Sequence, residues 1–513
     1  MRTFGKRMKK AFPALLALVS LATLPCFAAA PSWFTGMADD TWMAVAGATG
    51  QRITDVLPNP VPHTGLSGEN PNAITLAWCG GAVDQGRGEY LLCGNGGHAD
   101  YPGNEGYALS MRSETPAWRR LSDPTPNGNM GDVMNEGGGI YADGRPRSMH
   151  ASFECFGDGR VWHMLQNSVT SGGGGSVDGI VAYNRETIGT RTTPLPWTAS
   201  NLGPWELYGS VSPKFYLGIY IFGVAAFDPV DHKMWGLGGN GAGNTPYWSI
   251  GTGPSNLGVK NSYASNQSFG HWGGWACVAP ELRILIAGDH YRKTICVLDL
   301  KTITWTQVSN VTGTGLYEGG SGGVYLAGNK TIAVGLPRDS GRTINWLKIP
   351  TTAAGAYDPV GQWVWTNTTP SGPAMTSPLR NAGAYSKWNI IEDMGNGQSA
   401  IVYVNQIDGP TYVYKVPPSG SAAEKQRALA RNSMSLLPNP VTSGAKMQVT
   451  LASGIGHSEL RIYDLRGRMV ENISAGPAQK SAFVDTKNLH AGVYLLRAAD
   501  GSRENAVRFV VQK

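Results

Sequence analysis

Histidine, arginine and tyrosine side chains occur together in several glycine-rich segments that lie far apart along this 513-residue chain. Histidine and tyrosine can transfer protons, and arginine presents a planar fork that matches a carboxylate or a sulfate. The candidates for acid–base or charge-neutralising chemistry are His98, His150, Tyr208 and Arg145. The candidates for contacts with a substrate are Asp100, Tyr101, Arg147, Trp205, His271, His290, Arg292, Arg338 and Arg380.

β-Elimination from a uronic acid is the chemistry that such a set could perform. A cation or hydrogen-bond donor neutralises the carboxylate, a base removes the C5 proton, and an acid protonates the leaving oxygen. Arginine, histidine and tyrosine can supply these three roles. An anionic polysaccharide is therefore the expected substrate class.

Several candidates also have a structural interpretation that the sequence leaves open. His98 and Asp100 follow a glycine pair, where they could stabilise a turn, and Asp100 with Glu105 could bind calcium through oxygen ligands. Trp205 and Trp272, on predicted loops, are the candidates for stacking on a sugar face. Calcium is the one cofactor left open, since cysteine spacing typical of a zinc site does not occur.

The elements that must position these residues are strands, because residues 31–416 show almost no helical periodicity. Short apolar runs separated by Gly and Asp are typical of an all-β sandwich, barrel or propeller. The predicted strands include Ile74–Trp78, Tyr90–Cys93, Val161–Leu165, Gly179–Tyr183, Ile221–Phe227, Met234–Leu237, Arg283–Ala287, Thr294–Leu298, Thr331–Val334 and Ala400–Val404.

A repeat favours the propeller among these folds. Several runs end in a glycine pair, as in Cys93–His98 and Trp235–Asn240, and a tryptophan opens a later strand, as in Ala117–Leu121, Thr304–Val308 and Val364–Thr368. This order resembles kelch repeats, in which the glycines allow a tight turn and the tryptophan packs between blades. Second strands recur near residues 89, 161, 234, 283, 331 and 400, which fits six blades and leaves room for seven.

The last blade lacks a fourth strand after Tyr412–Val416, whereas Thr41–Ala46 has the composition of such a strand without a blade. We therefore expect the N-terminal strand to close the ring onto the last blade. A closed ring leaves only short edges, which protects the sheets from pairing with other chains.

Propellers of this kind have one face, here called the mouth, that carries the loops between second and third strands and the crossovers from blade to blade. The candidate residues fall on these loops, and the resemblance places them above a common axis. Some propeller polysaccharide lyases, including ulvan and oligogalacturonate lyases, are similar in this general sense. Their catalytic motif does not align position by position with this chain, so no family residue is transferred.

Both ends of the chain resemble export signals. Residues 1–30 have the basic, apolar, small-residue order of a secretory signal peptide, and Pro25 before Cys26 argues against a lipoprotein. Residues 435–513 resemble the C-terminal sorting domain of type IX secretion cargo, with Leu436–Pro440, Leu460–Arg468 and Leu489–Arg497 as landmarks. The resemblance implies a small β-sandwich, recognition by the secretion machinery, and a secreted or cell-surface protein. An ordinary carbohydrate-binding or immunoglobulin-like module is the alternative for this tail.

The expected domains are thus the signal peptide 1–30, a β-propeller 31–416, a linker 417–434 and the sorting domain 435–513. No later run reaches the roughly 18 apolar residues of a membrane span. The propeller segment carries 24 Lys and Arg against 29 Asp and Glu, so its charge does not favour nucleic acid as a partner.

Five cysteines lie beyond the signal peptide: Cys79, Cys93, Cys155, Cys277 and Cys296. Export permits disulfides, and Cys79 with Cys93 is the candidate bridge, because both are expected on neighbouring strands. Buried free thiols are expected for the others.

Three functions are compatible with these patterns. The first is a lyase on an anionic, uronic-acid-containing polysaccharide. The second is a non-catalytic, surface-displayed propeller that binds glycan or protein, since a fold does not by itself give an activity. The third is a copper radical oxidase of the galactose-oxidase kind, which needs paired Tyr and His ligands and a cysteine at the mouth, where cysteine is scarce.

Overall fold

The computed structural model of the protein describes most of the chain between residues 29 and 512. The gaps are 48–49, 64–69, 78, 97–100, 131–140, 147–151, 156–158, 166–178, 200, 209–223, 232, 238–243, 250–260, 265–273, 291, 319, 336–341, 376–383, 419–434, 438–440, 451–458, 465–467, 475–480 and 500–503. The predicted signal peptide, up to residue 28, and most of the predicted linker therefore lie outside the described residues.

Six sheets form the N-terminal part of the chain, and each is a blade with four antiparallel strands. Blades 1 to 3 contain, in sheet order, β2 (Ala82–Asp84), β3 (Glu89–Cys93), β4 (Gly106–Ser110) and β5 (Trp118–Arg120); β6 (Ser152–Cys155), β7 (Arg160–Leu165), β8 (Gly179–Asn184) and β9 (Trp205–Tyr208); and β10 (Val224–Asp228), β11 (Lys233–Leu237), β12 (Asn244–Ser249) and β13 (Asn261–Ala264).

Blades 4 to 6 follow the same order along the chain. They contain β14 (Trp275–Ala279), β15 (Ile284–Asp289), β16 (Thr294–Asp299) and β17 (Thr304–Gln307); β19 (Gly322–Leu326), β20 (Thr331–Gly335), β21 (Ile344–Lys348) and β22 (Trp363–Thr368); and β23 (Asn389–Ile391), β24 (Ala400–Val404), β25 (Thr411–Lys415) and β1 (Thr41–Val45). Blade 5 gains a fifth strand, β18 (Val311–Thr312), parallel to β22.

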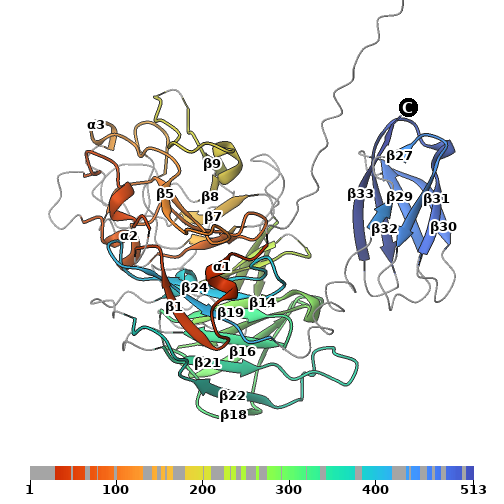
Figure 1. Cartoon of the computed structure of the whole chain (residues 1–513). Coiled ribbons are helices and arrows are strands. Elements are labelled where there is room, and N and C mark those ends of the chain that lie inside the picture. The colour runs from red at the N-terminus through yellow and green to blue at the C-terminus, as the bar shows by residue number, and fades with distance from the viewer. Residues whose placement is uncertain are drawn as a thin grey trace, which may run out of the picture.

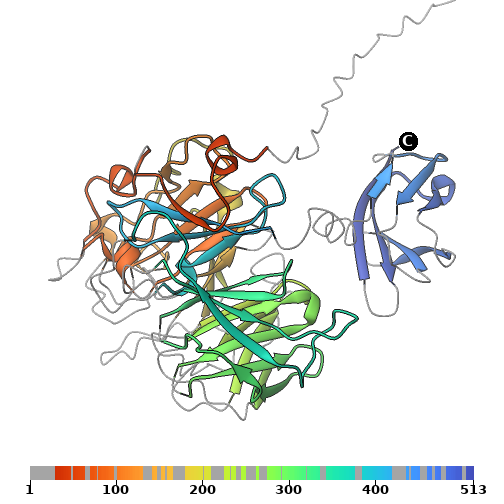
Figure 2. The same cartoon turned by 60° about the horizontal axis from the view of Figure 1, so that its bottom comes forward.

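The first strands of the six blades surround a common axis. β2 neighbours β6, β6 neighbours β10, and the series continues through β14, β19 and β23 back to β2. The sheets thus form a closed ring (Figures 1 and 2). The prediction of a β-propeller is confirmed with six blades, and the second strands begin at residues 89, 160, 233, 284, 331 and 400.

The N-terminal strand closes this ring as predicted. β1 pairs antiparallel with β25, with Thr41 opposite Lys415 and Val45 opposite Thr411. Blade 6 is therefore built from both ends of the propeller segment. Lys415 adds a second contact between β25 and the N-terminal segment. Its ammonium donates a 2.7 Å hydrogen bond to the Met37 carbonyl and lies 5.2 Å from the centre of the Phe34 ring.

Tryptophans on the fourth strands pack between neighbouring blades. Trp118 of blade 1 donates to the Thr411 hydroxyl of blade 6 at 3.0 Å, and Trp42 of blade 6 donates to the Arg342 carbonyl beside blade 5 at 3.1 Å. Trp305 and Trp365 are buried in the cores of the junctions between blades 3 and 4 and between blades 4 and 5. The predicted packing role of these four residues is confirmed.

Two predictions about residues 74–93 are wrong. Ile74–Trp78 is not a strand, because Ala73–Leu76 forms the short helix α2 and β2 begins only at Ala82. Cys79 therefore precedes the sheet, and both it and Cys93 are buried thiols that form no disulfide with each other. The Cys79 thiol lies against the carbonyls of Ile74 and Ala77, at 3.3 and 3.4 Å. Cys277 and Cys296 are buried thiols outside any disulfide, as expected.

The C-terminal part of the chain is a separate two-sheet sandwich. One sheet has the order β26 (Ser435–Leu437), β28 (Lys446–Thr450) and β31 (Ser481–Asp485); the other has the order β27 (Val441–Thr442), β33 (Glu504–Gln512), β32 (Gly492–Ala499), β29 (Glu459–Asp464) and β30 (Met469–Ser474). Alternate residues of these strands, such as Val449, Ile462 and Leu496, fill a core of their own. The predicted small β-sandwich is confirmed.

Candidate functional site

Many of the predicted mouth residues lie outside the described residues. This group comprises His98, Asp100, Arg147, His150, His271, Arg338 and Arg380. Tyr208 is the last residue of β9, and its side chain also lies outside the description. For these residues the catalytic and substrate-binding roles remain predictions.

Two described mouth candidates are buried in the protein. Arg145 is 2% exposed, and its guanidinium lies 3.4 Å from the carbonyls of Asp123 and Asn201. Burial lowers the pKa of Arg145, although the neighbouring Asp143 carboxylate opposes this effect. Tyr101 is 1% exposed, and its hydroxyl donates to Glu105 at 2.6 Å. Both side chains hold the loops of blade 1 together, and solvent does not reach them.

Glu105 is the centre of a buried polar cluster beneath this loop. The hydroxyls of Tyr101 and Tyr107 both donate to its Oε1 at 2.6 Å, while Oε2 is buried and has no hydrogen-bond partner among the described residues. Burial raises the pKa of Glu105, and the two hydroxyl contacts oppose that shift. Its exposed fraction of 2% makes calcium coordination from solvent a poor fit for this carboxylate.

Trp205 does not lie on a loop, so its predicted role in sugar stacking is corrected. It is the first residue of β9, is 3% exposed, and donates to the Asn104 carbonyl at 3.1 Å. Its ring packs edge-on against Tyr183 at 5.1 Å. Trp205 is thus the fourth-strand tryptophan of blade 2, equivalent to Trp118 in blade 1.

His290 and Arg292 remain as described mouth residues with solvent access. Both lie in the turn between β15 and β16. His290 Nδ1 is 3.0 Å from the Tyr317 carbonyl, and the half-exposed Arg292 guanidinium is 3.9 Å from the buried Asp289 carboxylate. These contacts orient one imidazole and one guanidinium at the mouth.

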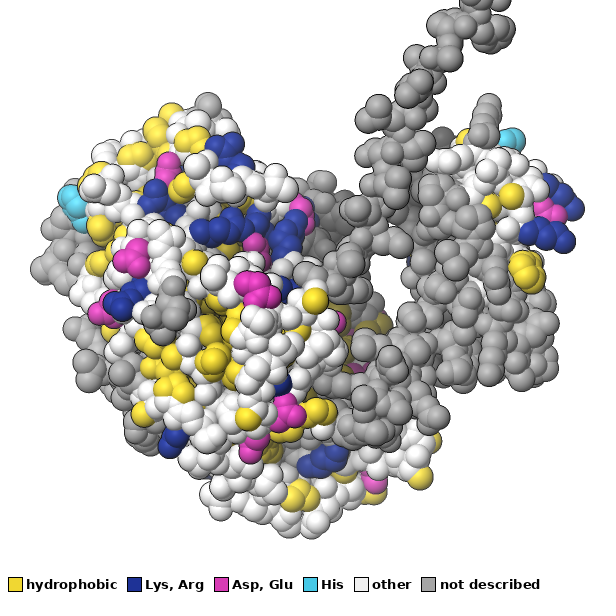
Figure 3. All heavy atoms as spheres, in the orientation of Figure 1, with side chains coloured by type: hydrophobic (Ala, Val, Ile, Leu, Met, Phe, Trp, Pro, Cys, Tyr) yellow, Lys and Arg dark blue, Asp and Glu magenta, His cyan; other side chains and the backbone are white. Residues whose placement is uncertain are grey.

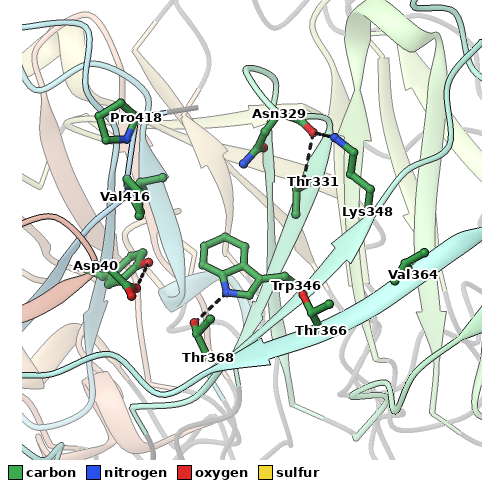
Figure 4. Close-up of a pocket in the computed structure, with 12 residues that line it drawn as sticks. Asp40, Asn329, Thr331, Trp346, Lys348, Val364, Thr366, Thr368, Val416 and Pro418 are labelled. Carbon is green, nitrogen blue, oxygen red and sulfur yellow. Dashed lines mark hydrogen bonds between the residues drawn. The ribbon is translucent and has the colours of Figure 1, made fainter. Parts of the chain in front are cut away.

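A groove between blades 5 and 6 opens at the end of the sheets opposite the mouth (Figure 4). This blade 5–6 groove has a volume of about 380 Å³. Because the strands are antiparallel, the β19–β20 turn with Asn329 and the end of β21 lie at that end. The lining residues are Asn329, Thr331, Trp346, Lys348, Val364, Thr366 and Thr368 from blade 5, and Asp40, Tyr414, Val416, Pro417 and Pro418 from blade 6 and its flanks.

Strand alternation explains why these residues share the groove. In β21, Ile344 is buried in the core between blades 5 and 6, so Trp346 and Lys348 point to the same side. In β22, Trp363 and Trp365 pack toward blade 4, which turns Thr366 and Thr368 toward blade 6. The groove is therefore the continuation of the junction core where large apolar side chains give way to polar ones.

Trp346 lies at the centre of the groove, with Asp40, Val416 and Pro418 on one side and Asn329, Thr331 and Lys348 on the other (Figure 4). Its indole donates to the Thr368 hydroxyl at 2.9 Å, and its ring centre lies 6.1 Å from that of Tyr414. Only part of the indole is buried. The free part of the ring is available to a ligand.

One acid and one base line the groove. Asp40 is exposed and accepts a 2.7 Å hydrogen bond from the Tyr414 hydroxyl; burial, and then Asp40 itself, raises the pKa of Tyr414. Lys348 donates to the Asn329 carbonyl. Partial burial and the neighbouring Lys330 lower the pKa of Lys348.

None of the groove residues was among the sequence candidates. A usable signal existed in Trp363–Thr368, where Trp363 and Trp365 fall on one face of the strand and Thr366 and Thr368 on the other. Polar residues at every second position of such a strand indicate a face that is not fully covered.

Comparison with known proteins supports the assignment of the tail. The family of secretion system C-terminal sorting domains matches residues 435–512. No curated protein sequence matches the chain. Among the described residues, no helix is long and apolar enough to span a membrane.

Several solved structures resemble the chain at low identity. PorZ, a type IX secretion component of Porphyromonas gingivalis, is 11% identical with a TM-score of 0.33, over 85% of this chain and 51% of PorZ. The allergen Mala s 1 of Malassezia sympodialis is 11% identical with a TM-score of 0.38, over 69% of this chain and 95% of that one. YjhT is 12% identical with a TM-score of 0.34, over 68% of this chain and 95% of YjhT. The chain spans about half the length of PorZ.

The sorting domain implies contact with the secretion machinery and a location outside the cell or on its surface. Residues 435–512 thus identify a cargo protein of type IX secretion, and the domain that it carries is a six-bladed β-propeller.

Proposed function

We propose that the propeller is a non-catalytic carbohydrate-binding domain and that the blade 5–6 groove is its binding site. The observation that carries this proposal is the half-buried Trp346 indole, surrounded by hydroxyl, amide, carboxylate and ammonium groups. A sugar ring has an apolar face that stacks on an aromatic ring and a rim of hydroxyls that need hydrogen-bond partners. The volume of about 380 Å³ lies within the range of about 300–1,000 Å³ typical of ligand sites.

The lining favours binding over glycoside hydrolysis. Hydrolysis of a glycosidic bond needs two carboxyl groups on either side of the bond. Asp40 is the one carboxylate among the described lining residues, and it already accepts a hydrogen bond from Tyr414. Export supports the same function, because it brings the domain to extracellular glycans.

Binding is tested with the full mature chain, that is, residues 31–513 without the predicted signal peptide. It is screened on a glycan array and then measured by calorimetry with the best ligand. The Trp346→Ala variant is expected to lose affinity about tenfold or more, since an aromatic contact contributes on the order of 1 kcal/mol beyond the area that it buries. Trp33→Ala is the matched control, because Trp33 is also half-buried but lies on the short helix α1 (Ser32–Thr35), outside the groove. Full affinity in Trp346→Ala would contradict the proposal.

A lyase on an anionic, uronic-acid-containing polysaccharide is the second candidate, and it concerns the mouth. The exposed Arg292 with the adjacent His290 favours it, since these groups could neutralise a carboxylate and move a proton. Incubation with ulvan, pectate, alginate and glycosaminoglycans would reveal unsaturated uronate by its ultraviolet absorbance. No unsaturated product on any of them would remove this candidate.

A further inference from the structure

We infer that the blade 5–6 groove selects neutral glycans, that is, sugar chains without carboxylate or sulfate groups. This inference rests on the proposed function of the groove. It names an uncharged ligand class, in contrast to the anionic polysaccharide that the mouth residues suggest.

The cations that an acidic sugar would need are few among the described residues of the groove. Proteins recognise carboxylate and sulfate through arginine forks or several ammonium groups, and no arginine is among the described residues that line the groove. Lys348 is the one cation among the described lining residues, and its ammonium donates to the Asn329 carbonyl of the same blade. Lys330, which is close to Lys348 but does not line the groove, forms an ion pair with Glu281 of blade 4.

Asp40 places a negative charge at the opposite wall. It is exposed, and the Tyr414 hydroxyl occupies one acceptor position of a carboxylate that can accept several hydrogen bonds. A sugar hydroxyl can donate to the remaining positions. A uronate or sulfate at the same place would be repelled, because like charges at short range disfavour each other. Figure 3 shows acidic and basic side chains interspersed on the face in view, without a field of one sign that would offset this repulsion.

The remaining polar partners are neutral. Thr366 is exposed, Thr368 accepts from the Trp346 indole, and Asn329 contributes an amide. Hydroxyl and amide groups both donate and accept, as sugar hydroxyls do. Tyr414 is 1% exposed and its ring plane is tilted by 49° from that of Trp346, so Tyr414 packs behind the indole, and Trp346 provides the ring for the apolar face of the sugar.

The test compares a uronan with the same polymer after chemical reduction of its carboxyl groups, so that the two ligands differ in charge alone. Calorimetry with the full mature chain is expected to show binding of the neutral polymer and at least tenfold weaker binding of the acidic one. Asp40→Asn is expected to narrow this difference by relieving repulsion. The affinity for the neutral polymer should not depend on salt.

The possible outcomes distinguish a failure of the inferred ligand class from a failure of the proposed function. Tighter binding of the acidic polymer, abolished by Lys348→Met and weakened by salt, would overturn the inference and leave the proposed function standing. Binding of neither polymer nor any other glycan, or binding that survives Trp346→Ala, would overturn the proposed function itself. Recognition of a protein partner through Trp346, with no glycan bound, would overturn both.

Discussion

At the scale of single residues, the mouth end of blade 1 is stabilised by a carboxyl group that has no cation in hydrogen-bond contact among the described residues. Glu105 is held by Tyr101 and Tyr107, and Gly103 allows the chain to pass close by. A Cβ atom at Gly103 would lie 2.3 Å from Glu105 Oε2 and 2.5 Å from the Tyr101 ring, so glycine is required for this packing. Burial keeps the pKa of Glu105 above its ordinary value of 4.5.

The raised pKa gives a prediction with a definite sign. The folded protein holds this proton more tightly than the unfolded chain does, so its stabilising effect is complete below about pH 4.5 and is lost as pH rises through the folded pKa. Glu105→Gln removes the titration. The variant should therefore become more stable relative to the wild type as pH rises above 4.5. Urea unfolding from acidic to neutral pH measures this, and parallel curves for the two proteins would contradict it.

At the scale of elements, buried ion pairs join neighbouring blades. Glu89 at the start of β3 is 8% exposed and accepts from Arg185 of blade 2 at 2.8 Å and from Arg119 of β5 at 2.5 Å. Blades 3 and 4 are joined in the same way by Arg283 and Asp228, at 2.8 Å. Burial alone would raise the pKa of Glu89, but the two arginines outweigh it and lower the pKa. The carboxylate is thus charged in the folded protein.

Removing this charge should weaken the junction of blades 1 and 2. Glu89→Gln leaves Arg185, which is 3% exposed, without its counter-charge. Breaking a buried ion pair on one side costs about 3 kcal/mol. We expect a clear fall in the free energy of unfolding, measured by denaturant titration. Glu114→Gln, the same change at an exposed position, is the control, and its free energy of unfolding should be close to that of the wild type. An equal loss of stability in both variants would contradict the prediction.

At the scale of the whole molecule, the ring depends on its N-terminal strand. Trp42 in β1 packs against Trp388 at 5.6 Å and against Tyr414 at 5.3 Å, so the strand that closes blade 6 also supports one wall of the groove. Without β1, the β25 edge would expose unpaired backbone groups.

Deletion of residues 31–46 is therefore expected to prevent closure of the propeller. Size-exclusion chromatography should show aggregated or expanded protein, and the cooperative thermal transition of the mature chain should be lost. A compact monomer that melts like the wild type would show that the ring closes by another route.

Much of this architecture could be predicted from local patterns. The second strands begin within one residue of their predicted positions, and Thr41–Val45 closes the ring as expected, because strand alternation, glycine turns and blade-packing tryptophans are properties of short segments. The errors have local causes as well. The apolar run at Ile74 resembles a strand but forms one helical turn, and Trp205 carries the same fourth-strand signal as Trp118 yet follows a long segment that resembles a loop.

The sequence by itself determined the export route, the class of fold and the order of the strands, since each follows from residues close together along the chain. Only the tertiary structure decided which polar side chains meet. Trp346 and Trp365 lie on adjacent strands of one blade, yet Trp365 is sealed against blade 4 while Trp346 faces an open groove. The reason is that the space between two blades depends on side chains from both, and those lie far apart in sequence until the ring has closed.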